Sequence, residues 1–461
     1  MIRKARYYPL GGRGVHLITT QRSITISMNH RPKWRAYQDK LKREAAFARY
    51  KKKLILAGCV ASGLVFVALV GIWLSHHDPT TVTAEPEVEQ KPTEPVGFSQ
   101  EKVTAMLSPV NGNGIQWAEK VVLDHSGVRY TLNTTINAKL QSYIDRMLNR
   151  SKTIQAAVVV LNPHDGRVLA MSSHDRNGEG ANLCLKADYP AASLFKIVSA
   201  AAAIEAAGYT PEKKLYYNGR RHTLYKNQLK ERRGRFTNET KFRKAFAASN
   251  NSVFGKLGMH VLGQDVIDDY ASRFYFNRSI PFDIPVEISS TEVPEDEFGL
   301  AEIASGFNKV TMVSPLHAAL LACTVVNKGE MVVPRLIDTV SDDSQAVLYR
   351  SHYRSLGPAV QTNTANGLKI MMEDTVRYGT GRKAFRKLRR RKMFRDFDLG
   401  AKTGTINDVT DRFKLDWVTA FALAPEGADG LCIGVLAVHG EKLGTRASEM
   451  ARAIIDSNLW S

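Results

Sequence analysis

A serine and a lysine stand one helical turn apart in an otherwise apolar segment. In "YPAASLFKIVSAAAAIEAAGY" (189–209), Ser193 precedes Lys196 by three residues, so the two side chains would share one face of a helix. A serine hydroxyl becomes a nucleophile when a neighbouring base removes its proton. The pair predicts covalent acyl transfer, although a helix N-cap followed by a solvated lysine gives the same spacing.

Two further motifs decide between these interpretations. The spacing of the first pair recurs at Ser99 and Lys102 in a polar linker, where it predicts no chemistry. Downstream, however, "AASNNSVF" contains S-N-N at 249–251, and "GAKTGT" contains K-T-G-T at 402–405. The S-x-N pattern also occurs at 27–29. The weight therefore lies on the ordered set of three motifs and not on any one of them.

This ordered set is the signature shared by penicillin-binding proteins and serine β-lactamases. From about residue 130 to the C-terminus, the chain resembles the transpeptidase domain of penicillin-binding proteins, through "AAVVVLNPHDGRVLAM", "ASLFKI", "ASNNSVFGKLG", "VSPLHAALLACTVVNKG", "YGTG" and "AKTGT". The resemblance implies an α+β fold, an antiparallel five-stranded sheet flanked by helices, with an all-helical subdomain. One departure is "ASGFNKVTMVSP", where the family usually has a G-x-G turn.

The resemblance also implies catalytic roles. Ser193 would be the nucleophile, and Lys196 would accept its proton if burial and a second cation, Lys402, lower the lysine pKa. Ser249 would bridge the two lysines and return a proton to the leaving amine. The backbone N–H groups of Ser193 and Thr405 would form the oxyanion hole.

A second set of residues would bind the substrate. Asn251 would hold a substrate amide. Lys402, Thr403 and Thr405 would line a strand edge that pairs with the substrate backbone and holds its terminal carboxylate. Gly404 would let that backbone approach closely. The implied substrate-binding residues are Asn251, Lys402, Thr403, Gly404 and Thr405.

The periodicity of apolar residues predicts the elements that position these groups. Residues 130–148 read as a strand followed by a helix, and residues 156–173 as a hairpin. Residues 397–405, 417–427 and 430–440 read as three strands, and residues 445–459 as a final helix. Helices are expected at 193–207 and 312–326. Strands at both ends of the domain with helices between them favour one antiparallel sheet covered by helices.

The N-terminal part predicts a membrane anchor. Residues 1–53 carry 15 Lys or Arg against two acidic residues, and the 21 residues that follow, 54–74, contain no charge. Such a run spans a bilayer, and its basic flank places the N-terminus in the cytoplasm. "LAGC", ending at Cys59, resembles a lipoprotein cleavage box, but too few apolar residues precede it. We expect a single-pass protein of the cytoplasmic membrane with its catalytic domain outside the cytoplasm.

These patterns predict five regions. They are a basic tail (1–53), a transmembrane helix (54–75), a Pro/Glu-rich linker (76–98), a short juxtadomain segment (99–129) and the transpeptidase domain (130–461). The 99–129 segment is too short for a glycosyltransferase domain. The chain therefore resembles the monofunctional class, and we expect glycan polymerisation by a separate glycosyltransferase among other wall-synthesis membrane proteins.

Positive charge is concentrated in three segments. Residues 1–53, 213–244 and 382–395 have net charges of +13, +10 and +9, whereas the whole chain has +19. The remainder is therefore acidic, and we expect no nucleic-acid partner. The two later segments lead into the S-N-N and K-T-G-T motifs. They are either solvated loops or surfaces beside the cleft that attract anionic wall polymer, lipid headgroups or an acidic partner.

The cysteines and histidines predict neither a disulfide framework nor a metal site. Cys323 and Cys432 lie in apolar runs typical of core thiols, and Cys184 leaves an odd number beyond the span. The histidines lack ligand spacing. We expect no metal and no cofactor.

The function that the resemblance implies is a serine D,D-transpeptidase. It would act on D-Ala-D-Ala stem peptides in peptidoglycan synthesis and would be acylated by β-lactams. The alternatives are a D,D-carboxypeptidase and a catalytically idle division or elongation scaffold, against which the intact motifs argue. A β-lactamase would add a water-activating group, such as a loop glutamate, for which the sequence offers no equivalent.

Overall fold

The computed structural model describes residues 98–108, 117–176, 178, 182–427 and 429–460. They belong to a compact unit that is distinct from residues 1–90. The predicted tail and membrane span, and nearly all of the predicted linker, lie outside the described residues. Among the described helices, none has the length and apolar character needed to cross a bilayer.

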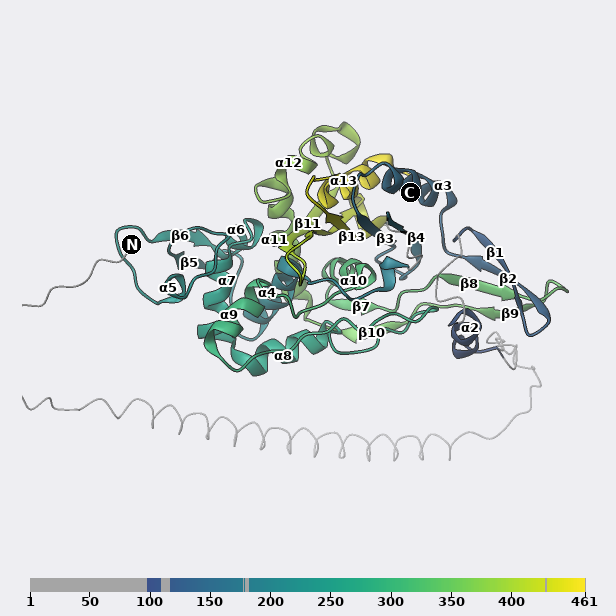
Figure 1. Cartoon of the computed structure of the whole chain (residues 1–461), viewed down its shortest axis with the longest axis horizontal. Coiled ribbons are helices and arrows are strands. Elements are labelled where there is room, and N and C mark those ends of the chain that lie inside the picture. Colours follow the sequence, from purple (N-terminus) through teal and green to yellow (C-terminus); the bar gives the residue numbers. More distant parts are fainter. Residues whose placement is uncertain (1–97, 109–116, 177, 179–181, 428, 461) are drawn as a thin grey trace, which may run out of the picture. The chain divides into compact units, whose positions relative to one another are not determined.

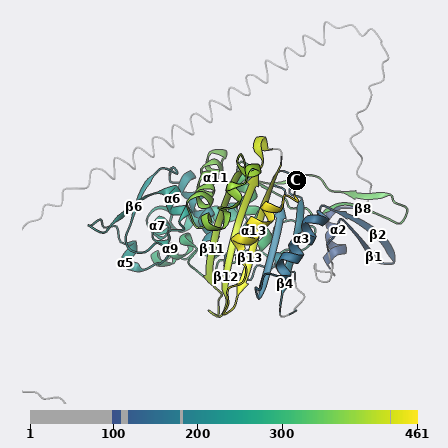
Figure 2. The ribbon, with the colours of Figure 1, turned by 90° about the horizontal axis from the view of Figure 1, so that it is seen from above.

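An antiparallel five-stranded sheet occupies the middle of the described domain (Figures 1 and 2). Its order is β11-β12-β13-β3-β4, which places β11 at an edge. The predicted hairpin and the three predicted C-terminal strands are confirmed. The strands are β3 (Gln155–Leu161), β4 (Val168–Asp175), β11 (Asp398–Asn407), β12 (Lys414–Leu423) and β13 (Gly430–His439).

Helices cover both faces of this sheet. Helix α10 (Pro315–Val326) packs against β3, β12 and β13 and is buried along nearly its whole length, which explains its apolar sequence. Helices α3 (Ala138–Asn149) and α13 (Ala447–Ser457) cover the opposite face. Consecutive residues of β3 accordingly face different hydrophobic cores. Val159 packs in the core that contains α10, and Val158 packs in the core that contains α3 and α13.

The rest of the transpeptidase region is mainly helical. One expectation needs correction, because this region is not all helical: β5 (Lys214–Tyr217) and β6 (Asn238–Lys241) form a two-stranded antiparallel sheet within it. Its helices and turns are α4 (Lys196–Glu205), α5 (Lys226–Leu229), α6 (Phe242–Ala247), α7 (Asn251–Leu257), η4 (Gly258–Leu262), α8 (Gly263–Arg273), α9 (Glu297–Ser305), α11 (Thr362–Arg377), α12 (Arg382–Phe385), η5 (Leu388–Arg390) and η6 (Lys392–Phe394).

A second, four-stranded sheet lies at the end of the domain opposite β5 and β6 (Figure 1). Its order is β1-β2-β8-β9, so residues before 135 pair with residues after 336. The predicted boundary between residues 129 and 130 falls inside β2. The elements here are α2 (Gln100–Leu107), β1 (Lys120–His125), β2 (Val128–Thr134), β8 (Ile337–Ser341) and β9 (Val347–Arg350). Strands β7 (Glu330–Val332) and β10 (Ser355–Pro358) form a separate two-stranded sheet, and β7 packs against α10.

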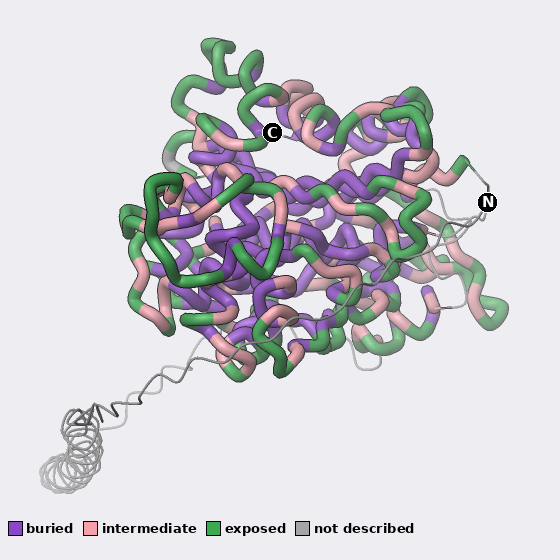
Figure 3. The backbone as a smooth tube through the Cα atoms, turned by 60° about the vertical axis from the view of Figure 1, so that its left-hand side comes forward, coloured by how far each residue is buried: buried purple, intermediate pink, exposed green. Residues whose placement is uncertain are grey.

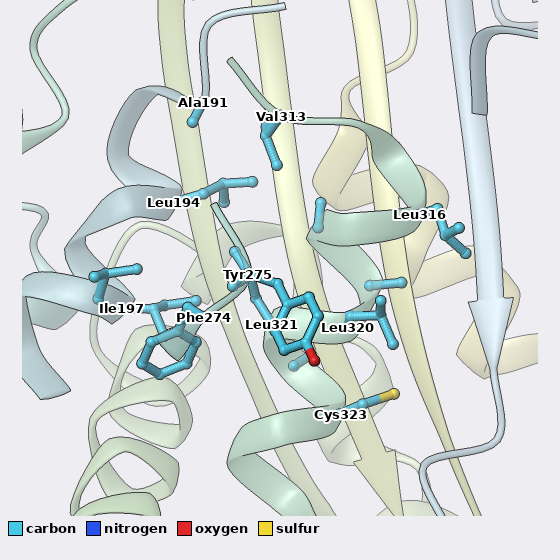
Figure 4. Packing of buried hydrophobic residues seen from close by; sticks show 14 of the residues in the cluster. Ala191, Leu194, Ile197, Phe274, Tyr275, Val313, Leu316, Leu320, Leu321 and Cys323 are labelled. Carbon is cyan, nitrogen blue, oxygen red and sulfur yellow. The ribbon is translucent and has the colours of Figure 1, made fainter. Parts of the chain in front are cut away.

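The main core lies between α10 and the start of α4. Leu194 and Ile197, from η3 (Ala192–Phe195) and α4, share a buried cluster with Phe274 and with Leu320 and Leu321 of α10 (Figure 4). Buried backbone fills the middle of the domain, and exposed backbone follows its loops (Figure 3). The segment that carries Ser193 is therefore anchored by core side chains.

Cys184, Cys323 and Cys432 are buried free thiols, which confirms the core position predicted for Cys323 and Cys432. Cys184 lies in η2 (Leu183–Leu185), which packs against β3 and β4, and burial raises its pKa to about 12. Burial and a hydrogen bond with Cys323 raise the pKa of Cys432 as well. Such thiols stay protonated and unreactive at neutral pH. Cys59 lies outside the described residues.

Candidate active site

Ser193 lies in the short 3₁₀ turn η3, and Lys196 begins α4 directly after it. Ser193 does not cap a helix, because neither η3 nor α4 has a side-chain cap. The preceding Ala192 has a φ of 50°, in the left-handed region that is uncommon for alanine. The Ser193 hydroxyl therefore does not have the helix-capping role that the spacing of Ser193 and Lys196 also allowed.

Gly306, at the C-terminus of α9, makes room for this turn. A Cβ placed on Gly306 would lie 2.0 Å from Ala192 O and 3.1 Å from Ser193 Cα, and its φ of 60° also favours glycine. In the sequence, the "ASGFNK" segment stands out only as a departure from the family. The close approach shows that this glycine shapes the floor beneath the serine.

Lys196 is fully buried and has three hydrogen-bond partners. Its Nζ lies 2.9 Å from Ser193 Oγ and 2.8 Å from Asn251 Oδ1, and it also contacts the carbonyl oxygen of Ser305. The last two atoms can only accept hydrogen bonds. A neutral amine has two N–H groups for them and one lone pair left for the Ser193 hydroxyl. The geometry therefore suits Lys196 as the base for Ser193.

Burial and the Lys402 charge favour that neutral amine. Burial, followed by repulsion from Lys402, holds the pKa of Lys196 well below that of a solvated lysine. Burial lowers the pKa of Lys402 itself to about 7. No carboxylate pairs with either amine within the described domain, as the low pKa values require.

Ser249 occupies the tight turn between α6 and α7. It has a φ of 52°, and Asn250 caps α7 by accepting a hydrogen bond from Val253 N at 3.2 Å. This turn presents Ser249 and Asn251 toward the two lysines. Ser249 Oγ lies 3.0 Å from Lys402 Nζ.

Asn251, rather than Ser249, contacts Lys196. Its Oδ1 accepts from Lys196, and its Nδ2 donates to His222 O at 3.2 Å. Both ends of this amide are therefore engaged before any substrate arrives. The prediction that Ser249 bridges the two lysines needs correction, because Ser249 contacts Lys402 whereas the serine that contacts Lys196 is Ser193.

The K-T-G-T motif lies on β11, the edge strand. Lys402 Nζ donates to Ser249 and to Thr403 O at 2.7 Å. A Cβ on Gly404 would lie only 3.1 Å from Ala192 Cβ, so the strand backbone runs against the turn that carries Ser193. The predicted oxyanion donors are backbone N–H groups of these two segments, that of Ser193 in the turn and that of Thr405 in the strand. Their role remains a prediction.

The side chains of both threonines in the motif have hydrogen-bond partners within the domain. Thr403 Oγ1 lies 2.5 Å from Thr380 Oγ1, and Thr405 Oγ1 lies 3.4 Å from Asp416 Oδ1. Asp416 also accepts a hydrogen bond from Ala447 N at the start of α13, at 3.1 Å. These contacts hold in place the edge strand β11, which is predicted to bind the substrate.

Several residues near the site were missed by sequence reasoning. The main ones are His222, Ser305, Thr380 and Asp416. They contact the motifs through the fold and not through sequence spacing; Thr380 lies within the quoted "YGTG" and Ser305 within the quoted "ASGFNKVTMVSP", whereas His222 and Asp416 stand in no quoted motif. Partial desolvation, followed by the charges of Lys196 and Arg221, lowers the pKa of His222.

The repeated S-x-x-K pattern has a structural role. Ser99 Oγ accepts a hydrogen bond from Lys102 N at 3.4 Å and caps α2. This pair lies on the element next to the second sheet, away from the three motifs. The S-x-N copy at 27–29 lies outside the described residues.

Comparisons with known proteins agree with this geometry. The family model "Penicillin binding protein transpeptidase domain" matches residues 156–456. The peptidoglycan D,D-transpeptidase PbpA of Mycobacterium tuberculosis is 25% identical over 366 residues, which cover 71% of this chain and 72% of PbpA. Stage V sporulation protein D of Bacillus subtilis is 23% identical over 298 residues, 61% of this chain but only 45% of that protein.

Solved structures show the same fold. The crystal structure of PBPA from M. tuberculosis matches with a TM-score of 0.57 and 24% identity, covering 71% of this chain and 80% of that one. The D,D-transpeptidase domain of a peptidoglycan glycosyltransferase from Eggerthella lenta matches with a TM-score of 0.58 and 20% identity, covering 71% and 82%. The family model covers well over half of the chain, and this chain therefore belongs to the penicillin-binding protein transpeptidase family.

Proposed function

We propose that this chain is a serine D,D-transpeptidase that cross-links peptidoglycan through an acyl-enzyme on Ser193. The observation that carries the proposal is the 2.9 Å contact between Ser193 Oγ and Lys196 Nζ, where the lysine is buried and its pKa is lowered. The relatives named PbpA are peptidoglycan D,D-transpeptidases, which supports a stem peptide ending in D-Ala-D-Ala as the substrate.

The acylation step follows from the hydrogen bonds at the site. Lys196 takes the Ser193 proton, and Oγ bonds to the carbonyl carbon of the penultimate D-Ala. The backbone N–H groups of Ser193 and Thr405 stabilise the oxyanion. The C–N bond then breaks, and the departing D-Ala amine receives the Ser249 hydroxyl proton, which the protonated Lys402 amine replaces. Transfer of the proton held by Lys196 to neutral Lys402 through solvent then restores both lysines.

The second step decides between two products. An amine of a neighbouring stem peptide attacks the ester and yields a cross-link, or water attacks it and yields a trimmed peptide. The edge position of β11 supports pairing with an extended peptide. Such pairing serves either outcome, and the relatives named D,D-transpeptidases make transpeptidation our first proposal and carboxypeptidase activity the second. An idle scaffold is disfavoured because the buried lysines retain their serine partners.

β-Lactams are proposed to acylate the same serine. Solved structures of M. tuberculosis penicillin-binding protein A include acyl-enzyme complexes with penicillin G, ceftriaxone and imipenem. Ser193 and its neighbours provide the nucleophile, base and oxyanion donors that opening a β-lactam ring requires. No metal or cofactor takes part in either reaction as we propose it.

A product assay tests the reaction. The full chain in detergent is incubated with a peptide ending in D-Ala-D-Ala and with an amine acceptor, and products are identified by mass spectrometry. We expect release of D-Ala with formation of the peptide–acceptor adduct, and neither product with Ser193→Ala. Release of D-Ala with only hydrolysed peptide would assign a carboxypeptidase, and no turnover by folded protein would favour the scaffold.

The cellular setting is likewise a proposal. The uncharged run at 54–74 after a basic tail supports a single-pass protein of the cytoplasmic membrane, with the enzyme domain outside the cytoplasm. Glycan polymerisation would come from a separate glycosyltransferase acting with other wall-synthesis membrane proteins. Protease treatment of intact spheroplasts should digest the enzyme domain and spare the tail. Protection of the enzyme domain would reverse this topology.

A further inference from the structure

Six of the seven Lys and Arg side chains in the loop between β5 and β6 form a group that we call the basic rim: Arg220, Arg221, Lys230, Arg232, Arg233 and Arg235. All six are exposed. We propose that the basic rim binds the carboxylates of neighbouring stem peptides on a peptidoglycan strand whose reacting peptide occupies the cleft. This inference rests on the proposed function, and it assigns the rim the role of holding a polyanionic strand next to the reacting peptide.

The rim is distinguished from nearby basic residues by its lack of acidic partners. Closer to the domain body, Lys214 pairs with Glu239 at 3.0 Å, Lys241 with Glu212 at 2.6 Å, and Lys244 with Asp374 at 3.2 Å. By contrast, no ion pair within 4.0 Å joins a rim side chain to a carboxylate of the described residues. The pKa of Glu239 is lowered chiefly by its hydrogen bond with Lys214, and the Arg233 charge adds to this effect. The fold therefore neutralises the base of the loop and leaves its outer part positively charged.

The rim begins beside the catalytic turn. Arg221 O accepts a hydrogen bond from Asn251 N at 2.6 Å, and the next carbonyl, of His222, accepts from the Asn251 side chain at 3.2 Å. Asn251 in turn contacts Lys196. An anionic chain that leaves the cleft past Asn251 would meet Arg221 first.

The loop that carries the rim is anchored. Gln228 is buried, and its side chain donates to Asn218 O and Arg220 O while accepting from Thr223 Oγ1 and Tyr225 N. Asn218 also donates to Arg232 O at 3.1 Å. These bonds anchor the backbone at Arg220 and Arg232, so binding does not have to order the loop backbone there.

A cavity of about 440 Å³ opens beside the rim along α7 and η4. Its lining includes Tyr216, Arg232, Arg233, Lys256 and His260, and its one acidic residue, Glu231, lies 3.7 Å from Lys256. The Arg233 guanidinium stacks on Tyr216 at 3.7 Å from the ring centroid. Basic and aromatic walls of this kind suit a carboxylate-bearing peptide or sugar.

The substrate supplies the complementary charge. Each stem peptide that is not cross-linked ends in a carboxylate, so a strand with several such peptides is a polyanion. Attraction between a polyanion and a row of exposed cations raises local concentration and is weakened by salt. The rim is therefore expected to affect the binding of polymeric wall material and not acylation by a small β-lactam.

The second basic segment provides a matched control. Residues 382–395 contain nine basic residues, but Phe385, Leu388 and Phe394 anchor this segment in the core shared with α3 and α13. That core lies on the face of the sheet opposite α10, whose core includes Leu194 beside Ser193. The exposed charges at 389, 390 and 392 thus match in number the three rim charges at 232, 233 and 235 that the test removes, and they do not lie on the loop that contacts the catalytic turn.

The test measures binding of the full chain, in detergent, to purified sacculi freed of secondary polymers, over a range of NaCl concentrations. The variants are Arg232→Gln/Arg233→Gln/Arg235→Gln and the control Arg389→Gln/Arg390→Gln/Lys392→Gln. We expect the rim variant to bind about fivefold or more weakly at low salt, with a shallower salt dependence, while the control matches wild type. Amidation of sacculus carboxylates should remove the difference.

Four outcomes would overturn the inference: unchanged binding by the rim variant, equal loss in both variants, unchanged binding to amidated sacculi, or binding only to walls that keep phosphate polymers. Penicillin labelling of each variant is measured in parallel. The rim variant should label at the wild-type rate. Absent labelling of wild type would count against the proposed function, whereas normal labelling with unaltered sacculus binding would count against the rim alone.

Discussion

Lys196 Nζ lies 2.9 Å from Ser193 Oγ although the two residues belong to different helical segments. The 3₁₀ turn ends where α4 begins, so Ser193 is set apart from the regular helix while Lys196 is fixed within it. Because Asn251 and Ser305 accept the other hydrogen bonds of the amine, its free lone pair is directed at the serine. The amine is therefore held ready to act as a base.

Removing the base should abolish most acylation without unfolding the protein. Lys196→Met keeps an unbranched side chain in the buried site but has no lone pair that can accept the Ser193 proton. We expect the rate of penicillin acylation to fall by about 10²-fold or more. Circular dichroism should show a folded protein, and the exposed-site control Lys139→Met should acylate normally. Near-normal acylation of Lys196→Met would assign the base elsewhere.

The pH profile should report the electrostatic link between the two lysines. The charge of Lys402 helps to lower the pKa of Lys196, so Lys402→Met should raise that pKa. Because acylation requires neutral Lys196, the acid limb of the acylation rate should move to higher pH. The pH at which the acid limb falls is compared, and not the absolute rate, since Lys402→Met also removes the substrate contact that we propose for Lys402. An unmoved limb, or a shift to lower pH, would contradict the link.

Gly306→Ala should disturb Ser193 from a distance in sequence. The new Cβ would meet Ala192 O at 2.0 Å, whereas a Cβ on Gly208, whose φ of 65° is similar, would have no heavy atom within 4 Å. We expect Gly306→Ala to lose about 1–3 kcal/mol of unfolding free energy and to acylate more slowly. Gly208→Ala should keep its acylation rate, which separates the clash from the cost of the backbone conformation.

Much of the fold was predictable, because its strands and helices carry regular apolar patterns. The hairpin at 156–173 and the three C-terminal strands are buried, and their side chains had to be apolar. The strands β5 and β6 were not predicted, because each has only four residues and β6 is polar and mostly exposed. The pairing of β2 with β8 joins residues 131–134 to residues 337–341, a relationship that no local pattern contains.

The candidate site was predictable only to the extent that its residues stand in motifs. Ser193, Lys196, Ser249 and Lys402 were identified by order and spacing, and the structure brings them together. The Asn251–Lys196 contact was not foreseen, since motif spacing says nothing about which side chain of a turn points to which lysine. Gly306 was not identified from the sequence for a similar reason. A side chain at this position would clash with Ala192, which lies more than a hundred residues earlier in the chain.

Asp283 should link the second sheet to the domain body. It is fully buried, and its Oδ2 accepts hydrogen bonds from Leu336 N at 2.6 Å and Ile337 N at 2.9 Å. Asp283→Ala leaves both N–H groups unpaired and should cost about 2 kcal/mol or more of unfolding free energy. Asp283→Asn keeps one acceptor oxygen for both donors and should cost less. Equal losses in thermal unfolding would mean that the charge, and not the acceptor, matters.

The most direct test of the central claim is covalent labelling of the full chain in detergent with a fluorescent penicillin, followed by intact-mass measurement and peptide mapping. We predict one adduct per chain, located on the peptide that contains Ser193, and no adduct on folded Ser193→Ala. An unlabelled but folded wild-type chain, or a label that persists in Ser193→Ala, would contradict the assignment of Ser193 as the acylated nucleophile.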